Sequence, residues 1–380
     1  MKFFEELVEQ GHERVLLCSN PEVGLKAIIA VHSTVLGPGL GGLRMWPFAN
    51  GEEALTDVLR LSRGMTYKAA AAGLNLGGGK AVILGDPKVD KSEALFRAFG
   101  RYVESLGGLY ITAEDVGTDM EDMDLVLTET RWVTGVSPAL GGSGDPSPVT
   151  AYGVLQGMKA AAKERYGEKS LAGRGVAIQG LGSVGFYLAR YLREEGAKVF
   201  GADIDRESAD RARDEEGVEI VSPDEILEVD CDILAPCALG AVLDDVSIPK
   251  LRCHVVAGGA NNQLAEPARH GTALQEAGIL YAPDFVVNAG GLINVYNELG
   301  GNYSRDRALR MTRGIYVNLT RVFRISRDQH IPTAEAADRL AEERIRTIQS
   351  LGSRHWGRFL HDGRPGIADK VGDLLASPLP

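Results

Sequence analysis

The chain is poor in cysteine and in the motifs that hold metals. Only four of its 380 residues are cysteines, and none of them forms a Cys-x-x-Cys pair. So few cysteines do not indicate a disulfide framework, and buried free thiols in a reducing cytoplasm are the simpler interpretation. The sequence also has no HExxH motif and no Cys/His cluster, so we predict that it binds no metal.

Long apolar runs and an excess of positive charge are also missing. No apolar stretch approaches the roughly 20 residues that a membrane helix needs. The N-terminal stretch MKFFEELVEQGHERV has early acidic residues instead of the apolar core of a secretory signal. Lys and Arg number 41 against 52 Asp and Glu, a formal net charge of −11. Because nucleic-acid affinity depends on clustered Lys and Arg, we expect a cytoplasmic protein that binds neither nucleic acid nor a membrane.

The length and the order of segments indicate two α/β domains. Single domains usually span about 100 to 200 residues. Apolar, β-branched segments at 25–35 and 80–86 predict strands, and the apolar residues of 52–73, which lie between them, recur at helical spacing. Such alternation is typical of α/β proteins. The Gly-, Pro- and Ser-rich segment 137–148 indicates a boundary, residues 333–351 predict one long amphipathic helix, and the last dozen residues show no pattern.

Residues 175–205 contain the most specific single motif. An apolar strand leads into Gly180-x-Gly182-x-x-Gly185, and a helix and a second strand ending at Asp203 follow. In this motif the glycines permit a tight turn, close approach of a pyrophosphate, and close packing of helix on strand. The N–H groups at the start of the helix attract the pyrophosphate. The sequence therefore predicts a Rossmann dinucleotide-binding domain.

Asp203 bears on the choice of dinucleotide. A carboxylate at the end of the second strand can accept hydrogen bonds from ribose hydroxyls and would repel a 2′-phosphate, which favours NAD over NADP. The alternative is that Asp203 only caps a turn before Arg206. A nicotinamide cofactor implies hydride transfer, so other residues must bind and activate the substrate.

Two lysines and an acidic pair are candidates for that role. Lys68 and Lys80 lie in GMTYKAAAAGLNLGGGK, where small residues let main chain and substrate approach closely. In a closed cleft, burial and a neighbouring cation can make one lysine a base, while another stays charged and binds a carboxylate. Glu114 and Asp115 follow the apolar pair Tyr110 and Ile111, where active-site groups of α/β sheets collect. Solvated carboxylates at a helix N-terminus are an equally good account of them.

The motifs, taken in order, resemble one family over nearly the whole chain. They are similar to the amino-acid dehydrogenases related to glutamate dehydrogenase, and most of all to those that act on branched-chain amino acids. The resemblance implies reversible NAD-dependent oxidative deamination of an L-amino acid to the 2-oxo acid and ammonia, by a homo-oligomer, octamer or dimer. The matching segments are GLKAIIAVH, LGPGLGGLRMW, RGMTYKAAAAGLNLGGGKAVILGDP, YITAEDVGT, GGSGDPSPVTAYGV, GLGSVG, APCALG, GGANNQL and NAGGLINV.

The resemblance also implies roles for individual residues. Lys68, with Gly42 and Met65, would bind the substrate carboxylate. Lys80 would activate the water that attacks the imine, Asp115 would carry a proton to or from the nitrogen, and Asn262 would be a further substrate contact. The expected cofactor residues are Thr150, Gly180, Leu181, Gly182, Ser183, Val184, Gly185, Asp203 and Asn261.

An apolar wall is expected at the far end of the substrate site. Relatives that act on glutamate carry a cationic residue where this sequence has Leu40, and an apolar wall would leave a charged side chain unpaired. Leucine, valine or isoleucine would fit. Phenylalanine-specific members share such a wall and are the close alternative. The other expected wall residues are Ala113, Leu292 and Val295, and the sequence departs from the commonest pattern of leucine-specific members at Gly142, Asp145 and Leu292.

Two other classes of protein remain as alternatives. A non-catalytic NAD-binding regulator should have lost a catalytic lysine, and both are present. A hydroxy-acid dehydrogenase usually needs a histidine beside a carboxylate, and no histidine lies in a recognisable motif of that kind. We expect a substrate-binding and oligomerisation domain of residues 1–135 and 331–380, an NAD-binding Rossmann domain of residues 136–330, and a cleft between them.

Overall fold

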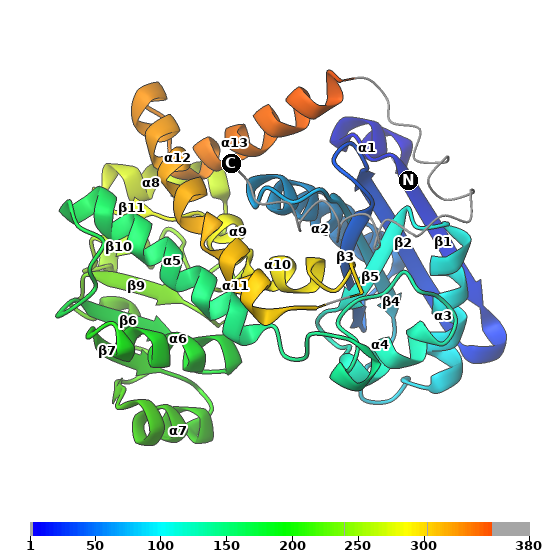
Figure 1. Ribbon diagram of the computed structural model, residues 1–380, viewed down its shortest axis with the longest axis horizontal. Coiled ribbons are helices and arrows are strands. Elements are labelled where there is room, and N and C mark those ends of the chain that lie inside the picture. The colour runs from blue at the N-terminus through cyan, green and yellow to red at the C-terminus, as the bar shows by residue number, and fades with distance from the viewer. Residues whose placement is uncertain (1–2, 239, 302, 352–380) are drawn as a thin grey trace. The chain divides into compact units, whose positions relative to one another are not determined.

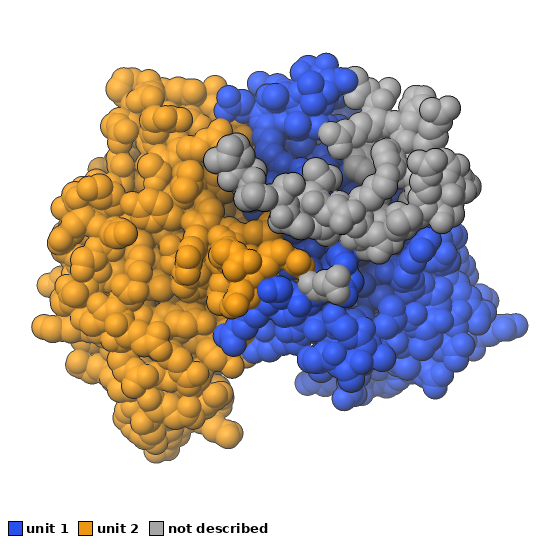
Figure 2. All heavy atoms as spheres, viewed as in Figure 1, with its two compact units in different colours: residues 1–145, 295–305, 342–380 blue, residues 146–294, 306–341 orange. Residues whose placement is uncertain are grey.

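The computed structural model describes residues 3–238, 240–301 and 303–351. The chain divides into two units (Figure 2), and it leaves the first of them at Asp145, inside the segment expected to form a boundary. The domain limits at 135 and 331 stay a prediction, and the pattern-free last dozen residues lie outside the described part. Unit 1 comprises Met1–Asp145, Val295–Arg305 and Glu342–Pro380, and unit 2 comprises Pro146–Asn294 and Asp306–Ala341.

Unit 1 contains a mixed five-stranded sheet in the order β1-β2-β4-β3-β5 (Figure 1). β3 pairs in parallel with β4 and β5, whereas β2 is antiparallel to both of its neighbours. The strands are β1 (Arg14–Asn20), β2 (Leu25–Ser33), β3 (Gly39–Trp46), β4 (Gly77–Leu84) and β5 (Tyr110–Glu114); the helices are α1 (Phe3–Gln10), α2 (Gly51–Ala71), α3 (Glu93–Ser105) and α4 (Met120–Leu127), with a 3-10 turn, η1 (Pro21–Val23), after β1 and another, η2 (Pro138–Leu140), after α4.

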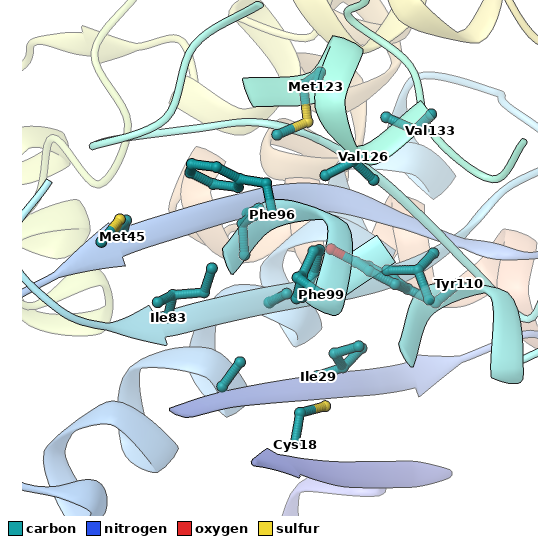
Figure 3. Packing of buried hydrophobic residues seen from close by; sticks show 14 of the residues in the cluster. Cys18, Ile29, Met45, Ile83, Phe96, Phe99, Tyr110, Met123, Val126 and Val133 are labelled. Carbon is teal, nitrogen blue, oxygen red and sulfur yellow. The ribbon is translucent and has the colours of Figure 1, made fainter. Parts of the chain in front are cut away.

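Helices cover both faces of this sheet because the central strands are apolar on both sides. In β2, Ile28 and Ala30 point toward α2, whose buried residues include Val58. The alternate residues of β2 belong to a larger core that α3 and α4 complete (Figure 3). Strands buried on both faces read as continuous apolar runs, which is why 25–35 is recognisable in the sequence. The larger core includes Cys18, Ile29, Met45, Ile83, Phe96, Phe99, Tyr110, Met123 and Val126.

The helices of unit 1 begin at residues that supply N-caps. Asn50 Oδ1 accepts hydrogen bonds from the N–H groups of Glu52 and Glu53 at the start of α2. Asp119 and Asp122 form a reciprocal capping box at the start of α4. Such caps are worth roughly 1 kcal/mol each. They fix the starts of two helices that flank the candidate site residues of unit 1.

Unit 2 contains a parallel six-stranded sheet in the order β11-β10-β9-β6-β7-β8. This is the order of a doubly wound dinucleotide-binding sheet, whose direction of winding reverses between β6 and β9. The α/β fold class with a Rossmann-type domain is therefore confirmed. The strands are β6 (Gly175–Gln179), β7 (Lys198–Ala202), β8 (Glu219–Ile220), β9 (Ile233–Pro236), β10 (Val255–Val256) and β11 (Leu280–Tyr281).

The helices of unit 2 include α5 (Ser147–Tyr166), which packs against α6 (Ser183–Glu194) and α12 (Gly314–Gln329) (Figure 1). Two of the four unit boundaries fall inside α10 (Gly290–Tyr296) and inside α13 (Thr333–Gln349), the helix predicted at 333–351. No helix among the described residues is long and apolar enough to cross a membrane. The remaining elements are α7 (Arg206–Glu216), α8 (Pro267–Glu276), α9 (Asp284–Val287), α11 (Arg305–Thr312), η3 (Ile226–Glu228) and η4 (Ile248–Lys250).

Candidate active site

The structure brings Lys80 and Asp115 together in unit 1. Lys80 lies in the middle of β4 and is only 5% exposed, and its Nζ lies 2.9 Å from Asp115 Oδ2. Asp115 follows β5, whose first two residues are the apolar pair Tyr110 and Ile111. Asp115 is also separate from the N-terminus of α4, whose first residue is Met120. A buried ammonium paired with a partly buried carboxylate can serve acid and base chemistry.

Arg44 is a third charged residue of this cluster, and no local sequence pattern predicted it. Arg44 Nε donates to Asp115 Oδ2 at 3.1 Å, and Arg44 Nη1 donates to Asp57 Oδ2 at 2.8 Å. Leu43 of β3 stands opposite Glu114 of β5, so the next residues, Arg44 and Asp115, are also neighbours. That register is the signal that could have found Arg44, but pairing between strands far apart in sequence is not visible in the residues themselves.

Opposing effects act on the pKa of Asp115. Burial raises it, and the charges of Lys80 and Arg44 lower it more, so the net pKa lies below the ordinary range of an aspartate. The carboxylate is therefore the stable form at neutral pH. Its neighbour Glu114 differs, because burial and the charges of Asp145 and Asp119 raise its pKa.

Two glycines of β3 let this cluster form. A Cβ atom at Gly42 would lie 2.7 Å from Asp115 Cβ and 2.5 Å from the carbonyl oxygen of Glu114. A Cβ atom at Gly41 would lie 3.3 Å from Met65 Cγ and 1.7 Å from the carbonyl oxygen of Gly79. The structure thus places Gly42 beside Asp115, and Met65 of α2 over the neighbouring glycine.

The three glycines before Lys80 form the first residues of β4, and their closest contacts are with the chain itself. A Cβ atom at Gly78 would lie 2.2 Å from the backbone nitrogen of Thr66, and one at Gly79 would lie 2.5 Å from the Tyr110 ring. Helix α2 and the Tyr110 ring therefore pack directly on the strand. The sequence suggested that these glycines make room for a substrate, and this packing of the chain on itself accounts for them.

Lys68 lies in the last turn of α2, on the helix that packs against β4, and its side chain is half-buried. Leu40 and Ala113 are buried on the neighbouring strands β3 and β5, where Leu40 stands opposite Ile111 and Ala113 stands opposite Gly42. Two expected wall residues are thus close to the charged cluster in the sheet. The other two, Leu292 and Val295, both belong to α10, Leu292 in unit 2 and Val295 in unit 1.

In unit 2, the glycine-rich turn after β6 has the shape that a dinucleotide requires. Gly180 has φ of 94°, which favours glycine, and a Cβ atom at Gly185 would lie 2.0 Å from the carbonyl oxygen of Gly180. Gly182 is the N-cap of α6, where no side chain caps the helix, and a Cβ atom added there would have no neighbouring atom within 4 Å. Exposed N–H groups at a helix start with open space beside them fit a pyrophosphate.

Asp203 lies directly after β7 and touches this turn. Its Oδ2 accepts a hydrogen bond from Leu181 N at 2.7 Å, and its Oδ1 accepts one from Asp205 N at 2.8 Å. The carboxylate thus caps a local turn, the alternative considered from sequence, and also contacts the glycine-rich turn. An ionised carboxylate has about four acceptor sites, so room for ribose hydroxyls remains.

The other expected residues of unit 2 lie in loops and at helix starts. Thr150 is in the first turn of α5, and its Oγ1 would lie 2.9 Å from a Cβ atom at Gly291. Asn261 Oδ1 accepts a hydrogen bond from Asn288 Nδ2 at 2.8 Å. Asn262 has a φ of 52°, which is uncommon for a residue other than glycine and costs on the order of 1 kcal/mol or more. Both asparagines are exposed.

Comparison with known proteins identifies the family. A family model described as Glu/Leu/Phe/Val dehydrogenase, dimerisation domain, matches residues 12–132, and one described as Glutamate/Leucine/Phenylalanine/Valine dehydrogenase matches residues 141–209 and 205–347. The chain belongs to the Glu/Leu/Phe/Val dehydrogenase family. It is therefore an amino-acid dehydrogenase, and the family and its Rossmann-type fold imply a nicotinamide cofactor.

Individual members of the Glu/Leu/Phe/Val dehydrogenase family are similar over nearly the full chain. The leucine dehydrogenase of Thermoactinomyces intermedius is 58% identical and covers 96% of this chain and 98% of its own length. The valine dehydrogenase of Streptomyces virginiae is 52% identical, covering 88% of this chain and 94% of its own. The crystal structure of L-tryptophan dehydrogenase from Nostoc punctiforme has a TM-score of 0.82 and 45% identity, covering 91% of this chain and 99% of its own.

A histidine beside a carboxylate does occur in this dehydrogenase. His270 Nε2 lies 3.4 Å from Asp245 Oδ1, and its Nδ1 accepts a hydrogen bond from the Glu266 N–H at the start of α8. The ring is 2% exposed and is held by its own helix, so a structural role accounts for it. Among the described residues there is no group of three or more His, Cys, Asp or Glu side chains that could hold a metal, and the four cysteines are free thiols.

Proposed function

We propose that this enzyme catalyses reversible, NAD-dependent oxidative deamination of a branched-chain L-amino acid, leucine with valine and isoleucine, to the 2-oxo acid and ammonia. The observation that carries the proposal is the buried Lys80 Nζ, 2.9 Å from Asp115 Oδ2, beside the buried apolar residue Leu40 of the same sheet. The similarity to a leucine dehydrogenase at 58% identity supports it.

Each expected residue has a role in this proposal. Lys80 activates the water that attacks the imine, and Asp115 takes a proton from the substrate nitrogen and returns it in the reverse reaction. Lys68 binds the substrate carboxylate with Gly42 and Met65, and Asn262 is a further substrate contact. Bound NAD supplies the hydride acceptor.

The proposed cofactor residues all lie in unit 2. The turn from Gly180 to Gly185, which includes Leu181, Ser183 and Val184, binds the pyrophosphate, and Asp203 binds the adenosine ribose. Thr150 and Asn261 are the further proposed contacts. The choice of NAD over NADP rests on Asp203, since its carboxylate would repel a 2′-phosphate.

The most specific part of the proposal is which substrate side chain the enzyme prefers. The proposed wall residues, Leu40, Ala113, Leu292 and Val295, are all apolar and would suit a branched aliphatic group, because a charged side chain would lose its water without gaining a partner. Phenylalanine is the alternative, and the 45% identity to an L-tryptophan dehydrogenase favours a test of large aromatic side chains. One methylene group is worth only about 1 to 3 kcal/mol of discrimination.

The test is NADH formation at alkaline pH with L-leucine, L-valine, L-phenylalanine, L-tryptophan and L-glutamate, repeated with NADP. We expect the highest kcat/KM with leucine or valine and NAD, and loss of activity in Lys80→Ala. Lys159→Ala is the matched control, because it removes another lysine paired with a carboxylate, Glu195 at 2.5 Å.

Each outcome of the panel has a definite meaning. If phenylalanine or tryptophan is best, the chemistry holds and the side-chain assignment fails. If no amino acid is turned over while NAD still binds, the proposed reaction is wrong. Full activity of Lys80→Ala would contradict the role of Lys80, and equal losses in Lys80→Ala and Lys159→Ala would point to general destabilisation.

We also propose a cytoplasmic homo-oligomer, octamer or dimer. The description of the first matching family model as a dimerisation domain supports assembly through unit 1. β1 forms an edge of the sheet in unit 1, and its Leu17 is 66% exposed. An exposed apolar edge strand is a common site of pairing between chains.

A further inference from the structure

The Asp115 carboxylate is held through one of its two oxygens. Oδ2 is the oxygen nearest to both cations, 2.9 Å from Lys80 Nζ and 3.1 Å from Arg44 Nε. A carboxylate that two cations hold through the same oxygen has little freedom to rotate. The geometry thus makes the two oxygens chemically different.

Arg44 is itself held by a second carboxylate. Its Nη1 contacts Asp57 Oδ2 at 2.8 Å, and Asp57 Oδ1 contacts Arg60 Nη2 at 3.1 Å on the same helix. All the side chains of this chain of contacts are at most 24% exposed except Arg60, at 57%; the two other cations are 6% exposed for Lys80 and 22% for Arg44. Exposed ion pairs contribute little, so the inner contacts carry the effect.

We propose that Arg44 is a positioning residue that holds Asp115 by Oδ2, with Asp57 holding Arg44 in turn, so that Oδ1 is the oxygen that exchanges a proton with the substrate nitrogen. This inference rests on the proposed role of Asp115. In deamination, Oδ1 takes a proton from the substrate ammonium, which leaves a neutral amine and a carboxylic acid. The reverse transfer restores the carboxylate.

The guanidinium group suits this task better than an ammonium would. Nε and Nη1 of Arg44 point to different carboxylates, one on each side, and a lysine offers only a single nitrogen. The charge of Arg44 also helps to lower the pKa of Asp115 against the effect of burial. A fixed orientation matters because a displacement of about 1 Å can cost on the order of 100-fold in rate.

The decisive variant is Arg44→Ala. We expect kcat to fall by about 10- to 100-fold, with KM for the amino acid nearly unchanged, because the substrate carboxylate is bound by Lys68. Arg44 and Asp57 line a surface cavity of about 540 Å³, together with Trp46 and Phe48. A guanidinium ion can therefore enter the space left by the side chain. A low, non-denaturing concentration of guanidinium chloride should restore part of kcat, and the same concentration of sodium chloride should not.

The matched control is Arg97→Ala. Arg97 also bridges two carboxylates through Nε and Nη1, to Glu129 at 2.6 Å and to Glu93 at 3.1 Å, and neither partner is a proposed site residue. Its kcat should stay near the wild-type value, with no response to guanidinium. A loss of the same size as in Arg44→Ala would overturn the proposal.

Two further variants separate the possible failures. If Asp115→Asn keeps wild-type kcat, the proposed role of Asp115 is wrong and this inference falls with it. If Asp115→Asn is inactive but Arg44→Ala is fully active, only the inference fails. Should Arg44→Ala not fold, Arg44→Lys decides: a clear loss of kcat at unchanged KM supports positioning by the fork, and wild-type kcat contradicts it.

Discussion

At the scale of single residues, His32 shows how burial controls protonation. Its Nε2 lies 3.0 Å from the carbonyl oxygen of Gln10, which can only accept, so Nε2 carries the hydrogen. Nδ1 then accepts from the Thr66 hydroxyl at 2.8 Å. Burial, helped by the nearby His12 and Arg63, lowers the pKa of His32 to about 4 against the opposing hydrogen bond to Gln10. A protonated ring could no longer accept the hydrogen bond from the Thr66 hydroxyl, and because the ring is buried, water would not replace that bond.

This histidine predicts a pH dependence of stability. Between pH 6.5 and 4 the unfolded chain binds a proton that folded His32 does not, so the free energy of unfolding should fall as pH falls through this range. A shift of this size is worth about 3 kcal/mol, complete near pH 4. Denaturant unfolding at several pH values should show the slope, and His32→Gln should flatten it.

The control for this measurement is His254→Gln, a change at an exposed histidine. It should leave the slope as in the wild type. Burial also lowers the pKa of His12, so a smaller dependence of stability on pH should remain in His32→Gln. A slope that His32→Gln does not change would contradict the assignment.

Residue identity alone located part of the candidate site. Lys80 stood out because glycines and other small residues precede it, and Asp115 because it follows an apolar, strand-like segment. Arg44 did not stand out, since its importance depends on the pairing of β3 with β5, which joins residues about 70 positions apart. The reason for the glycines before Lys80 was also hidden, because it lies in contacts with α2 and Tyr110.

At the scale of elements, the turn between β6 and α6 predicts different effects for two similar substitutions, one on NAD binding and the other on stability. Gly182→Ala should fold almost normally, because no atom lies within 4 Å of the added methyl group. It should nevertheless weaken NAD binding at least about 10-fold, or 1.4 kcal/mol, since that open space is where the pyrophosphate is proposed to bind. Titration of NADH fluorescence measures the affinity.

Gly185→Ala should instead lower stability. Its methyl group would lie 2.0 Å from the carbonyl oxygen of Gly180, and backbone atoms cannot move away cheaply. We expect a loss of roughly 1 to 3 kcal/mol in the free energy of unfolding. Normal NAD affinity in Gly182→Ala would argue against pyrophosphate binding at this turn, and a stable Gly185→Ala would contradict the packing argument.

The elements differ in how far the sequence predicts them. The buried strands β2 and β6 and the amphipathic helices α2 and α13 follow from local pattern, because burial on both faces or one face leaves a clear period. Three strands of unit 2 have only two residues each, too few for a period to show. The antiparallel pairing of β1 and β2 within a mixed sheet depends on contacts that no local pattern records.

At the scale of the whole molecule, the proposed assembly gives a simple prediction. Each chain has a mass of 40.7 kDa, so sedimentation equilibrium should give an integer multiple of this value, two or eight chains for the proposed states. Leu17→Asp, at the exposed β1 edge, should reduce the multiple, because a charge on an edge strand discourages pairing. Val89→Asp, at another exposed apolar residue, is the control. A monomer in the wild type would refute the assembly.

The two α/β folds were visible in the sequence, but the division of the chain was only partly so. The loop at 137–148 stands out because Gly, Pro and Ser cannot continue a helix or strand there. The chain passes from one unit to the other three more times: inside α10, between Arg305 and Asp306, and inside α13. In α13 the helical pattern continues without interruption. A boundary inside a regular helix leaves no mark in composition.

The four passages of the chain between the two units have a consequence for synthesis on the ribosome. Helix α5 ends at Tyr166, but the helix that packs on it, α12, ends only at Gln329. The buried residues of α12 include Ile315, Leu319 and Phe323. At about 5 to 20 residues per second, the nascent chain carries an uncovered apolar face of α5 for roughly 10 to 30 s. The sheet of unit 1 has its last strand by Glu114, but both units also include segments that emerge much later, up to Ala341 in unit 2 and beyond it in unit 1. Chaperones that bind exposed apolar segments should therefore meet this protein at α5.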